Sequence, residues 1–225
     1  MERAVASHYN ARPDVGTEQR KSSRIFHLKN FNNWVKAVLI SRHVRRDDYV
    51  LDLCCGKGGD LLKWKTGRIK YLFAADIAEF SVDQAKTRYQ SGNFPFNADF
   101  IACDCFSDDL LKHTRRQTFD IVNIQFALHY AFETEERATT AIRNIAKHLV
   151  SGGHFIGTIP NSNWIVKKLR DAPGLTFGNE IYSITFDQKD TWPIFGHQYR
   201  FALADAIDDC PEYLIHFPTL IKYIL

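Results

Sequence analysis

Three aspartates and a glycine-rich loop are the residues of this chain whose types and spacing favour ligand chemistry. The stretch "VLDLCCGKGGDLLKW", residues 50–64, contains a D-x-x-x-G-x-G pattern that begins at Asp52. Asp76 and Asp104 each end a later apolar run rich in β-forming residues. Glycine lets the backbone turn tightly and approach a ligand, because no Cβ intervenes. The pattern therefore predicts a ligand-binding loop with carboxylates around it.

Two phosphate-binding patterns fail on the spacing of this loop. The Walker pattern G-x-x-x-x-G-K-[ST] is absent, since Lys57 follows Gly56 with no Ser or Thr after it. The dinucleotide pattern G-x-G-x-x-G has Leu61 where its third glycine belongs. The spacing therefore excludes a dinucleotide-dependent oxidoreductase.

The three carboxylates suit a cationic nucleoside better than a polyphosphate. Asp76 stands where an acid binds the two hydroxyls of a ribose. Asp104 is placed to meet an adenine amino group, and Asp52 to face the ammonium of an amino-acid tail. S-adenosylmethionine has this shape and charge. The alternative is that Asp76 and Asp104 each cap the turn after their strand.

The five cysteines raise the question of a metal or redox site. They lack the paired C-x2–4-C spacing of a zinc site, and their odd number, with no secretory leader expected, speaks against a disulfide framework. We interpret them as small buried apolar residues in a reducing compartment. They are Cys54, Cys55, Cys103, Cys105 and Cys210.

The elements that must position the loop alternate between strand and helix. Near-continuous apolar strands separated by helices predict an α/β fold with a doubly wound, mostly parallel sheet. One helix is expected to open at Ser81, with Gln84 completing a capping box. Another presents an apolar face of Phe31, Trp34, Val35, Val38 and Leu39. The expected strands are 49–54, 71–76, 99–103, 119–126 and 153–159, and the expected helices include 31–44, 81–89 and 135–149.

The alternation of strand and helix ends after Pro160. A helix near 163–171 is followed by a predicted β-ribbon of 180–186 and 197–203, inserted after the fifth strand, and then by a helix from Pro218 to Leu225. The chain reads as a single domain, residues 23–225, preceded by a basic, flexible arm, residues 1–22.

The distribution of charge and hydropathy along the chain limits the classes of partner that the protein is expected to bind. Residues 1–46 hold ten Lys or Arg against three acids, although the whole chain carries only +3. This asymmetry indicates a polyanionic partner such as RNA, the alternative being a merely solvated arm. No run of eighteen apolar residues occurs, so no membrane span is predicted.

Several segments together resemble the mRNA cap guanine-N(7) methyltransferases of the cellular eukaryotic type. The similarity runs from about Ser23 to the last residue and is carried by "KNFNNWVK", "VLDLCCGKGGDLLKW", "FALHYAFE" and "FGNEIY…PIFG…YRF". It implies methyl transfer from S-adenosylmethionine to the guanine of capped mRNA, without a metal. It also implies RNA binding, nuclear localisation (cytoplasmic if viral), and other capping machinery or an activating subunit as partners.

The resemblance also implies roles for individual residues. Because guanine N7 carries a lone pair and no proton, no residue is expected to act by direct chemistry; Glu212 and His129 would support the transition state. Lys57, Lys63 and Arg88 would face the triphosphate bridge, their alternative being a solvated surface. The implied donor-binding residues are Lys36, Asp52, Cys54, Gly56, Asp76, Asp104, Gln125 and Tyr130. The implied cap-binding residues are Asn32, Asn33, Lys57, Lys63, Arg88, His129, Tyr199 and Glu212.

Alternatives to these roles stay open. The Asn32–Asn33 pair could instead cap a helix, and His129 could be a half-buried core histidine. The family usually has Gly where this chain has Cys54. Either the sulfur presses toward the tail of the donor, which would weaken donor affinity, or the loop is slightly shifted. The family's final antiparallel strands would follow the expected last helix, so we expect them to be missing here. A methyltransferase with another substrate, or a non-catalytic cap- or RNA-binding fragment, is the competing interpretation.

Overall fold

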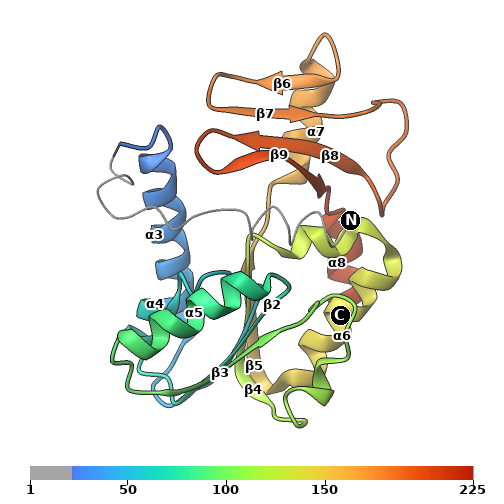
Figure 1. Cartoon of the computed structure of the whole chain (residues 1–225). Helices are drawn as coiled ribbons and strands as arrows, with labels where there is room; N and C mark the ends of the chain where they lie inside the picture. Colours follow the sequence, from blue (N-terminus) through green and yellow to red (C-terminus); the bar gives the residue numbers. More distant parts are fainter. Residues whose placement is uncertain (1–21, 225) are drawn as a thin grey trace.

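The computed structural model describes residues 22–224, so the expected arm lies almost entirely outside the described residues (Figure 1). The helices are α3 (Phe26–His43), α4 (Leu61–Gly67), α5 (Glu79–Ser91), α6 (Glu135–His148), α7 (Ser162–Asp171) and α8 (Phe217–Ile224), with 3₁₀ turns η1 (Leu110–Lys112) and η2 (Leu128–Glu133). The strands are β1 (Tyr49–Leu53), β2 (Tyr71–Asp76), β3 (Asn97–Ala102), β4 (Phe119–Gln125), β5 (Leu149–Thr158), β6 (Thr176–Gly178), β7 (Tyr182–Thr185), β8 (Gln198–Leu203) and β9 (Ile207–Tyr213).

The first five strands form one parallel sheet in the order β3-β2-β1-β4-β5. The predicted α/β class and parallel sheet are confirmed, although β3 and β5 begin earlier than expected, at Asn97 and Leu149. Strand order reverses at β1, between β2 and β4. Loops that leave the carboxyl ends of β1 and β4 therefore diverge there, at the position where such sheets bind ligands.

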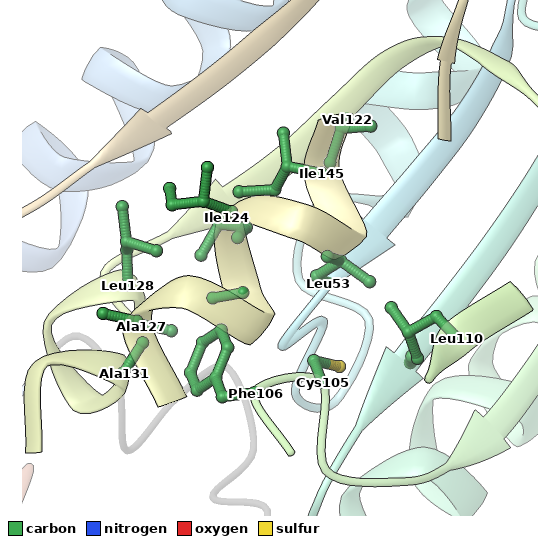
Figure 2. Close-up of a cluster of buried hydrophobic side chains, with 14 of the residues drawn as sticks. Leu53, Cys105, Phe106, Leu110, Val122, Ile124, Ala127, Leu128, Ala131 and Ile145 are labelled. Atoms are coloured by element: carbon green, nitrogen blue, oxygen red, sulfur yellow. The ribbon is translucent and has the colours of Figure 1, made fainter. Parts of the chain in front are cut away.

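Successive side chains of β1 point to opposite faces of the sheet and pack in two different hydrophobic clusters. Leu51 and Leu53 pack in a cluster with residues of β4 and α6, and Figure 2 shows Leu53, Ile124 and Ile145 of that cluster. Val50 packs on the other face, with Ile40 of α3 and residues of α4. Because neighbouring side chains in a strand point to opposite faces, Asp52 lies on the face covered by α3 and α4.

The predicted apolar face of α3 is buried only in part: Val35, Val38 and Leu39 are half-buried, and Leu39 packs against the cluster that contains Ile40. Ile40 is the buried residue of this helix, whereas Phe31 and Trp34 are 58% and 61% exposed and contact each other with ring centroids 6.1 Å apart. The helix instead turns the side that carries Lys36 toward α4. Hydrophobic periodicity identified the helix correctly, but the first part of the predicted face, at Phe31 and Trp34, is exposed.

The predicted capping box at Ser81 is wrong. Helix α5 begins two residues earlier, at Glu79, and Ser81 is buried within its first turn. The backbone N–H of Ala78, just before the helix, donates instead to Asp76 Oδ1 (2.9 Å). A carboxylate from the end of β2 therefore takes the role that the sequence pattern assigned to a serine hydroxyl.

The predicted two-stranded ribbon is a four-stranded antiparallel sheet in the order β6-β7-β8-β9. Its last strand, β9, was missed because Pro211 and neighbouring acids disfavour a strand; Pro211 is tolerated because β9 lies at the sheet edge. Ile165 and Leu169 of α7 pack against Ile184 of this sheet. In Figure 1 the sheet stands above the parallel sheet, in orange and red.

Polar contacts join the beginning of α3 to the second sheet. Ser23 Oγ and the Arg24 N–H both donate to Asp205 Oδ2, at 3.1 and 2.8 Å. Arg24 also pairs with Glu180 at 3.3 Å. These contacts hold the beginning of α3 beside the turn that precedes β9. They therefore fix α3, which carries Asn32 and Asn33, relative to the sheet that carries Tyr199 and Glu212.

Candidate functional site

A cavity of about 220 Å³ opens at the carboxyl ends of β1, β2 and β4. Ile77, Phe106 and Phe126 give it apolar walls, as expected for a nucleoside site. Lys36 and Asp52 do not line it. Six residues predicted to bind the donor do: Cys54, Gly56, Asp76, Asp104, Gln125 and Tyr130.

Asp76 both lines this cavity and caps the turn that follows β2. Its Oδ2 accepts from the Gly56 N–H (2.8 Å), and its Oδ1 accepts from the Ala78 N–H. Burial raises the pKa of Asp76, and these backbone donors only partly offset that effect. The two interpretations of this residue, ligand and cap, are therefore compatible: one carboxylate fixes the glycine loop against the cavity.

The glycine loop needs its glycines for two different reasons. Gly56 has φ +52°, and a Cβ there would project into open space beside the cavity, where a ligand would approach. Gly58 has φ +71°, and a Cβ there would lie 2.8 Å from Leu61 and 3.2 Å from Ala85. Gly56 thus keeps room for a ligand, whereas Gly58 permits close packing of the loop on α4 and α5.

Cys54 occupies a backbone position that favours glycine. It has φ +57° and lines the cavity. A contact with Cys105 lowers the pKa of the Cys54 thiol, but burial and Asp76 outweigh it, so the pKa is raised and the thiol stays protonated. The left-handed conformation costs a residue with a Cβ about 1–2 kcal/mol. The chain therefore carries a residue with a strained backbone at the cavity wall.

Replacing Cys54 by Gly is expected to tighten donor binding about three- to tenfold, because it removes a Cβ and a sulfur atom from the cavity wall and leaves more room for the ligand. Isothermal titration with S-adenosylhomocysteine would measure the change. Cys55→Ala serves as the matched control, since Cys55 neighbours Cys54 but does not line the cavity. Equal or weaker binding by the Cys54 variant would contradict the prediction.

Asp104 does not stand free at the end of its strand. Its Oδ1 accepts from the Phe106 N–H (2.9 Å), and Arg137 of α6 donates to both of its oxygens, at 2.9 and 3.3 Å. Arg137 lines the cavity and also pairs with Glu133 at 3.5 Å. A cation beside the predicted adenine carboxylate holds Asp104 in one orientation. Sequence reasoning missed Arg137, which no local pattern distinguishes from a solvent-facing helix residue.

Asp52 lies beneath the cavity, in a chain of buried hydrogen bonds. Trp64 Nε1 donates to its Oδ2 (3.2 Å) and Asn123 Nδ2 donates to its Oδ1 (2.7 Å). Gln125 Nε2 donates in turn to Asn123 Oδ1 (2.6 Å), and Thr158 Oγ1 donates to Gln125 Oε1 (2.9 Å). Asp52 therefore orients Gln125, which does line the cavity.

A second charged network ties α3 to the glycine loop. Lys36 Nζ and Lys63 Nζ each lie 2.8 Å from Asp60 Oδ1. Lys63 also donates to Asn33 Oδ1 (2.6 Å). Lys36, predicted to contact the donor, and Lys63, predicted to face the triphosphate, are thus held by a buried carboxylate that sequence reasoning missed. Asp60 could have been predicted as a functional residue, since it belongs to the same glycine-rich stretch, residues 50–64.

The pH dependence of donor binding is expected to report on Asp52. Burial, and then the nearby Asp60, raise the pKa of Asp52 to about 7. Below this pH the carboxyl is neutral, and above it is charged. A cationic donor binds the charged form better, so its affinity should rise as pH increases through 7.

Titration of S-adenosylmethionine binding from pH 5.5 to 8.5 would measure this slope. Asp52→Asn has no carboxyl to titrate at this position and should give a flat profile over the same range. A slope that survives in Asp52→Asn would assign the titration to another group.

A separate buried cluster surrounds Glu212, on β9. Tyr199 Oη donates to Oε2 (2.6 Å), Tyr130 Oη donates to Oε1 (3.4 Å), and His129 Nε2 lies 3.6 Å from Oε2. Burial would raise the pKa of Glu212. His129 and the two tyrosine hydroxyls outweigh burial, so this pKa lies below its ordinary value and the carboxylate stays charged.

The members of this cluster differ in what they can still bind. Tyr199 is only 1% exposed and gives its hydroxyl to Glu212, so it supports that carboxylate rather than standing at an open surface. His129 is 2% exposed, and neither of its ring nitrogens has a hydrogen-bond partner among residues 22–224. Nε2 lies at ion-pair distance from Glu212, whereas Nδ1 has no partner within the described residues, which favours a ligand partner for that nitrogen over a core role.

Tyr130 connects the cavity to this cluster. It lines the cavity and its hydroxyl reaches Glu212. The tyrosine comes from η2, which begins three residues after the end of β4. Two sites predicted separately, for donor and for guanine, therefore share a wall, which is what direct transfer between two bound molecules requires.

The remaining predicted cap residues lie on the helices beside the loop. Asn32 and Asn33 are inside α3, whose N-cap is Ile25, so their alternative role as helix caps is wrong. Lys57 Nζ lies 5.8 Å from the ring centroid of Phe80. Arg88 is in the last turn of α5 and is partly buried. Their contact with a triphosphate stays a prediction.

Neither a metal site nor a membrane helix accounts for these clusters. Within residues 22–224, no group of three His, Cys, Asp or Glu side chains is arranged to hold a metal ion. The helices of the same range are too short or too polar to cross a membrane.

Comparison with known proteins assigns a family to this arrangement. The model of the mRNA (guanine-N(7))-methyltransferase domain matches residues 1–224. The mRNA cap guanine-N(7) methyltransferase of Schizosaccharomyces pombe is 48% identical over 95% of this chain, and that of Drosophila melanogaster 43% over 97%. The chain spans only 62% and 56% of the lengths of these two relatives.

Solved structures show the same fold at low sequence identity. A S-adenosylmethionine-dependent methyltransferase from Clostridium acetobutylicum superimposes with a TM-score of 0.59, at 15% identity, over 86% of this chain and 78% of its own. The PH0226 protein from Pyrococcus horikoshii gives 0.58, at 14% identity, over 97% and 87%.

Proposed function

Because the chain belongs to the mRNA (guanine-N(7))-methyltransferase family, we propose that it transfers a methyl group from S-adenosylmethionine to N7 of the guanine that caps mRNA. The observation that carries this proposal is the shared wall at Tyr130, which joins a nucleoside-sized cavity to a buried carboxylate. The relatives are eukaryotic capping enzymes, which supports action in the nucleus.

The cavity suits the donor by its chemistry. Asp76 and Asp104 offer carboxylates at the ends of neighbouring strands, and Gly56 leaves open space beside them. Asp52 adds negative charge below the cavity, toward which a sulfonium and an ammonium would be drawn. When bound, the donor supplies a methyl group on positively charged sulfur, which becomes a neutral thioether once the methyl has left.

Glu212 and His129 fit the edges of a guanine. The two oxygens of Glu212 can accept from the paired N–H groups on one edge, while His129 can donate to the neighbouring carbonyl. As N7 attacks the methyl carbon, its lone pair forms the new bond and the guanine becomes cationic. The charged Glu212, held by Tyr199, would stabilise that developing charge. No residue needs to remove a proton, because N7 carries none.

Positioning is therefore the main demand on the protein. Tyr130 stands between the two molecules, and the Asp52–Asn123–Gln125 chain fixes the opposite side of the cavity. Aligning nucleophile, methyl carbon and sulfur at near-attack distance supplies most of the acceleration that such transfers need.

A transfer assay tests the proposal directly. The purified chain would be mixed with labelled S-adenosylmethionine and an RNA ending in unmethylated guanosine triphosphate, with an uncapped triphosphate RNA as control. Cap-dependent labelling of guanine is expected. Donor binding without transfer would support a non-catalytic fragment, and labelling that ignores the cap would refute the substrate assignment.

A further inference from the structure

A second cavity, of about 480 Å³, lies between α7 and residues 192–197. It shares no lining residue with the first cavity, which is lined by Gly56 and Asp76 among others. Its lining combines cations, an aromatic ring and imidazoles: Lys167, Arg170, Trp192, His197 and His216, with Asp171 as its one acid. The proposed function makes no use of any of them.

The cations and the aromatic ring form one surface. Lys167 and Arg170 are three residues apart on α7 and therefore lie on the same side of the helix. The Arg170 guanidinium lies 4.9 Å from the ring centroid of Trp192, which is 36% exposed. Guanidinium planes and indole rings are among the side-chain surfaces on which unpaired bases stack, and lysine is a general phosphate contact.

A buried polar group without a partner marks the floor of the cavity. His197 is only 5% exposed, and its Nε2 has no hydrogen-bond partner among residues 22–224. Burial lowers the pKa of His197, so the ring is neutral near pH 7. Its ring centroid lies 5.2 Å from that of Trp192. An unsatisfied imidazole beneath an aromatic wall is costly unless a bound molecule or water completes it.

This cavity lies close to the proposed guanine site. The ring centroid of Phe186 is 5.6 Å from that of His197 and 5.6 Å from that of Tyr199. Tyr199 in turn donates to Glu212. Two aromatic side chains therefore separate the second cavity from the carboxylate proposed to hold the cap, a distance that the triphosphate and a few nucleotides can span.

We propose that this second cavity binds a nucleotide of the single-stranded RNA that follows the cap, with its base packed on the Arg170–Trp192 pair and its phosphate facing Lys167. The inference rests on the proposed function, because a cap bound at Glu212 fixes the point from which the RNA extends. Binding of this nucleotide makes the enzyme prefer a capped transcript over an isolated cap.

Kinetics with two substrates test this proposal. One substrate is a cap dinucleotide and the other a capped RNA of ten nucleotides. For Arg170→Gln, KM for the capped RNA should rise about five- to hundredfold, the range that loss of a base-stacking contact produces, while the dinucleotide is unaffected. Arg170→Lys keeps the charge but loses the planar surface, so it should resemble Arg170→Gln. Lys147→Gln, which removes one exposed charge from α6, is the control.

The outcomes separate the two hypotheses. If the unaltered chain methylates neither substrate, the proposed function fails. If Arg170→Gln leaves both substrates unaffected, or weakens both equally, the cavity does not bind the transcript and the inference fails alone. Trp192→Phe, which preserves an aromatic wall, should retain most of the preference for the longer RNA. Unchanged turnover of the cap dinucleotide shows that a loss in the Arg170 variants is not caused by misfolding.

Discussion

Replacing Glu212 by Gln is expected to lower kcat about 10²- to 10³-fold while leaving the Kd for the methyl donor unchanged. Glu212 is buried, charged and bonded by Tyr199, so its negative charge is fixed before guanine becomes cationic. The amide has nearly the same shape, but it lacks the charge and offers one acceptor oxygen in place of two. The loss should therefore appear in the chemical step and in guanine binding.

Single-turnover methyl transfer at saturating donor would measure this effect, and isothermal titration with S-adenosylhomocysteine would measure donor binding. Tyr199→Phe is the matched control: it keeps the charge but removes the hydroxyl that orients it, so a smaller loss is expected. Equal losses in donor binding and in kcat for Glu212→Gln would count against the role proposed for this carboxylate.

Replacing Asp76 by Asn is expected to weaken donor binding about ten- to hundredfold and to leave the fold intact. The two oxygens of Asp76 accept from Gly56 and Ala78, and the carboxylate also lines the cavity. An amide NH₂ in place of one oxygen would face a backbone N–H, so the glycine loop would move. Hydrogen bonds to charged groups contribute about 1.5–3 kcal/mol, which corresponds to about ten- to hundredfold in affinity.

Donor titration and thermal unfolding of the same variant would separate binding from stability. Asp83→Asn serves as the control, because Asp83 is an exposed acid on α5 that does not line the cavity. If donor affinity falls only in proportion to a loss of thermal stability, Asp76 is a structural cap and no more.

These two variants should fail in different ways, because they act on opposite sides of Tyr130. Asp76 belongs to the donor cavity and Glu212 to the cluster beyond it. Asp76→Asn should regain turnover when donor concentration is raised, whereas Glu212→Gln should not. That contrast distinguishes binding from transition-state stabilisation.

The parallel sheet and its ligand loop could be predicted from local sequence. Apolar runs such as 71–76, interrupted by helical segments, allow few arrangements other than a sheet covered on both faces. Gly56 and Gly58 then mark the loop after β1, and Asp76 and Asp104 mark the next strand ends. These inferences hold because the period of a strand and the conformational freedom of glycine are local properties.

Tertiary structure decided what the local pattern could not. Arg137 reaches Asp104 across 33 residues, and Asn123 reaches Asp52 across 71. Tyr199 turned out to be buried behind Glu212, and Phe31 turned out to be exposed. Which face of a helix is buried, and which partner a charge finds, depend on how elements distant in sequence pack together. Sequence by itself determined the elements, the ligand loop and the chemical class of the residues. Packing alone determined which of those residues touch a cavity and which hold others in place, because a side chain's neighbours come from every part of the chain.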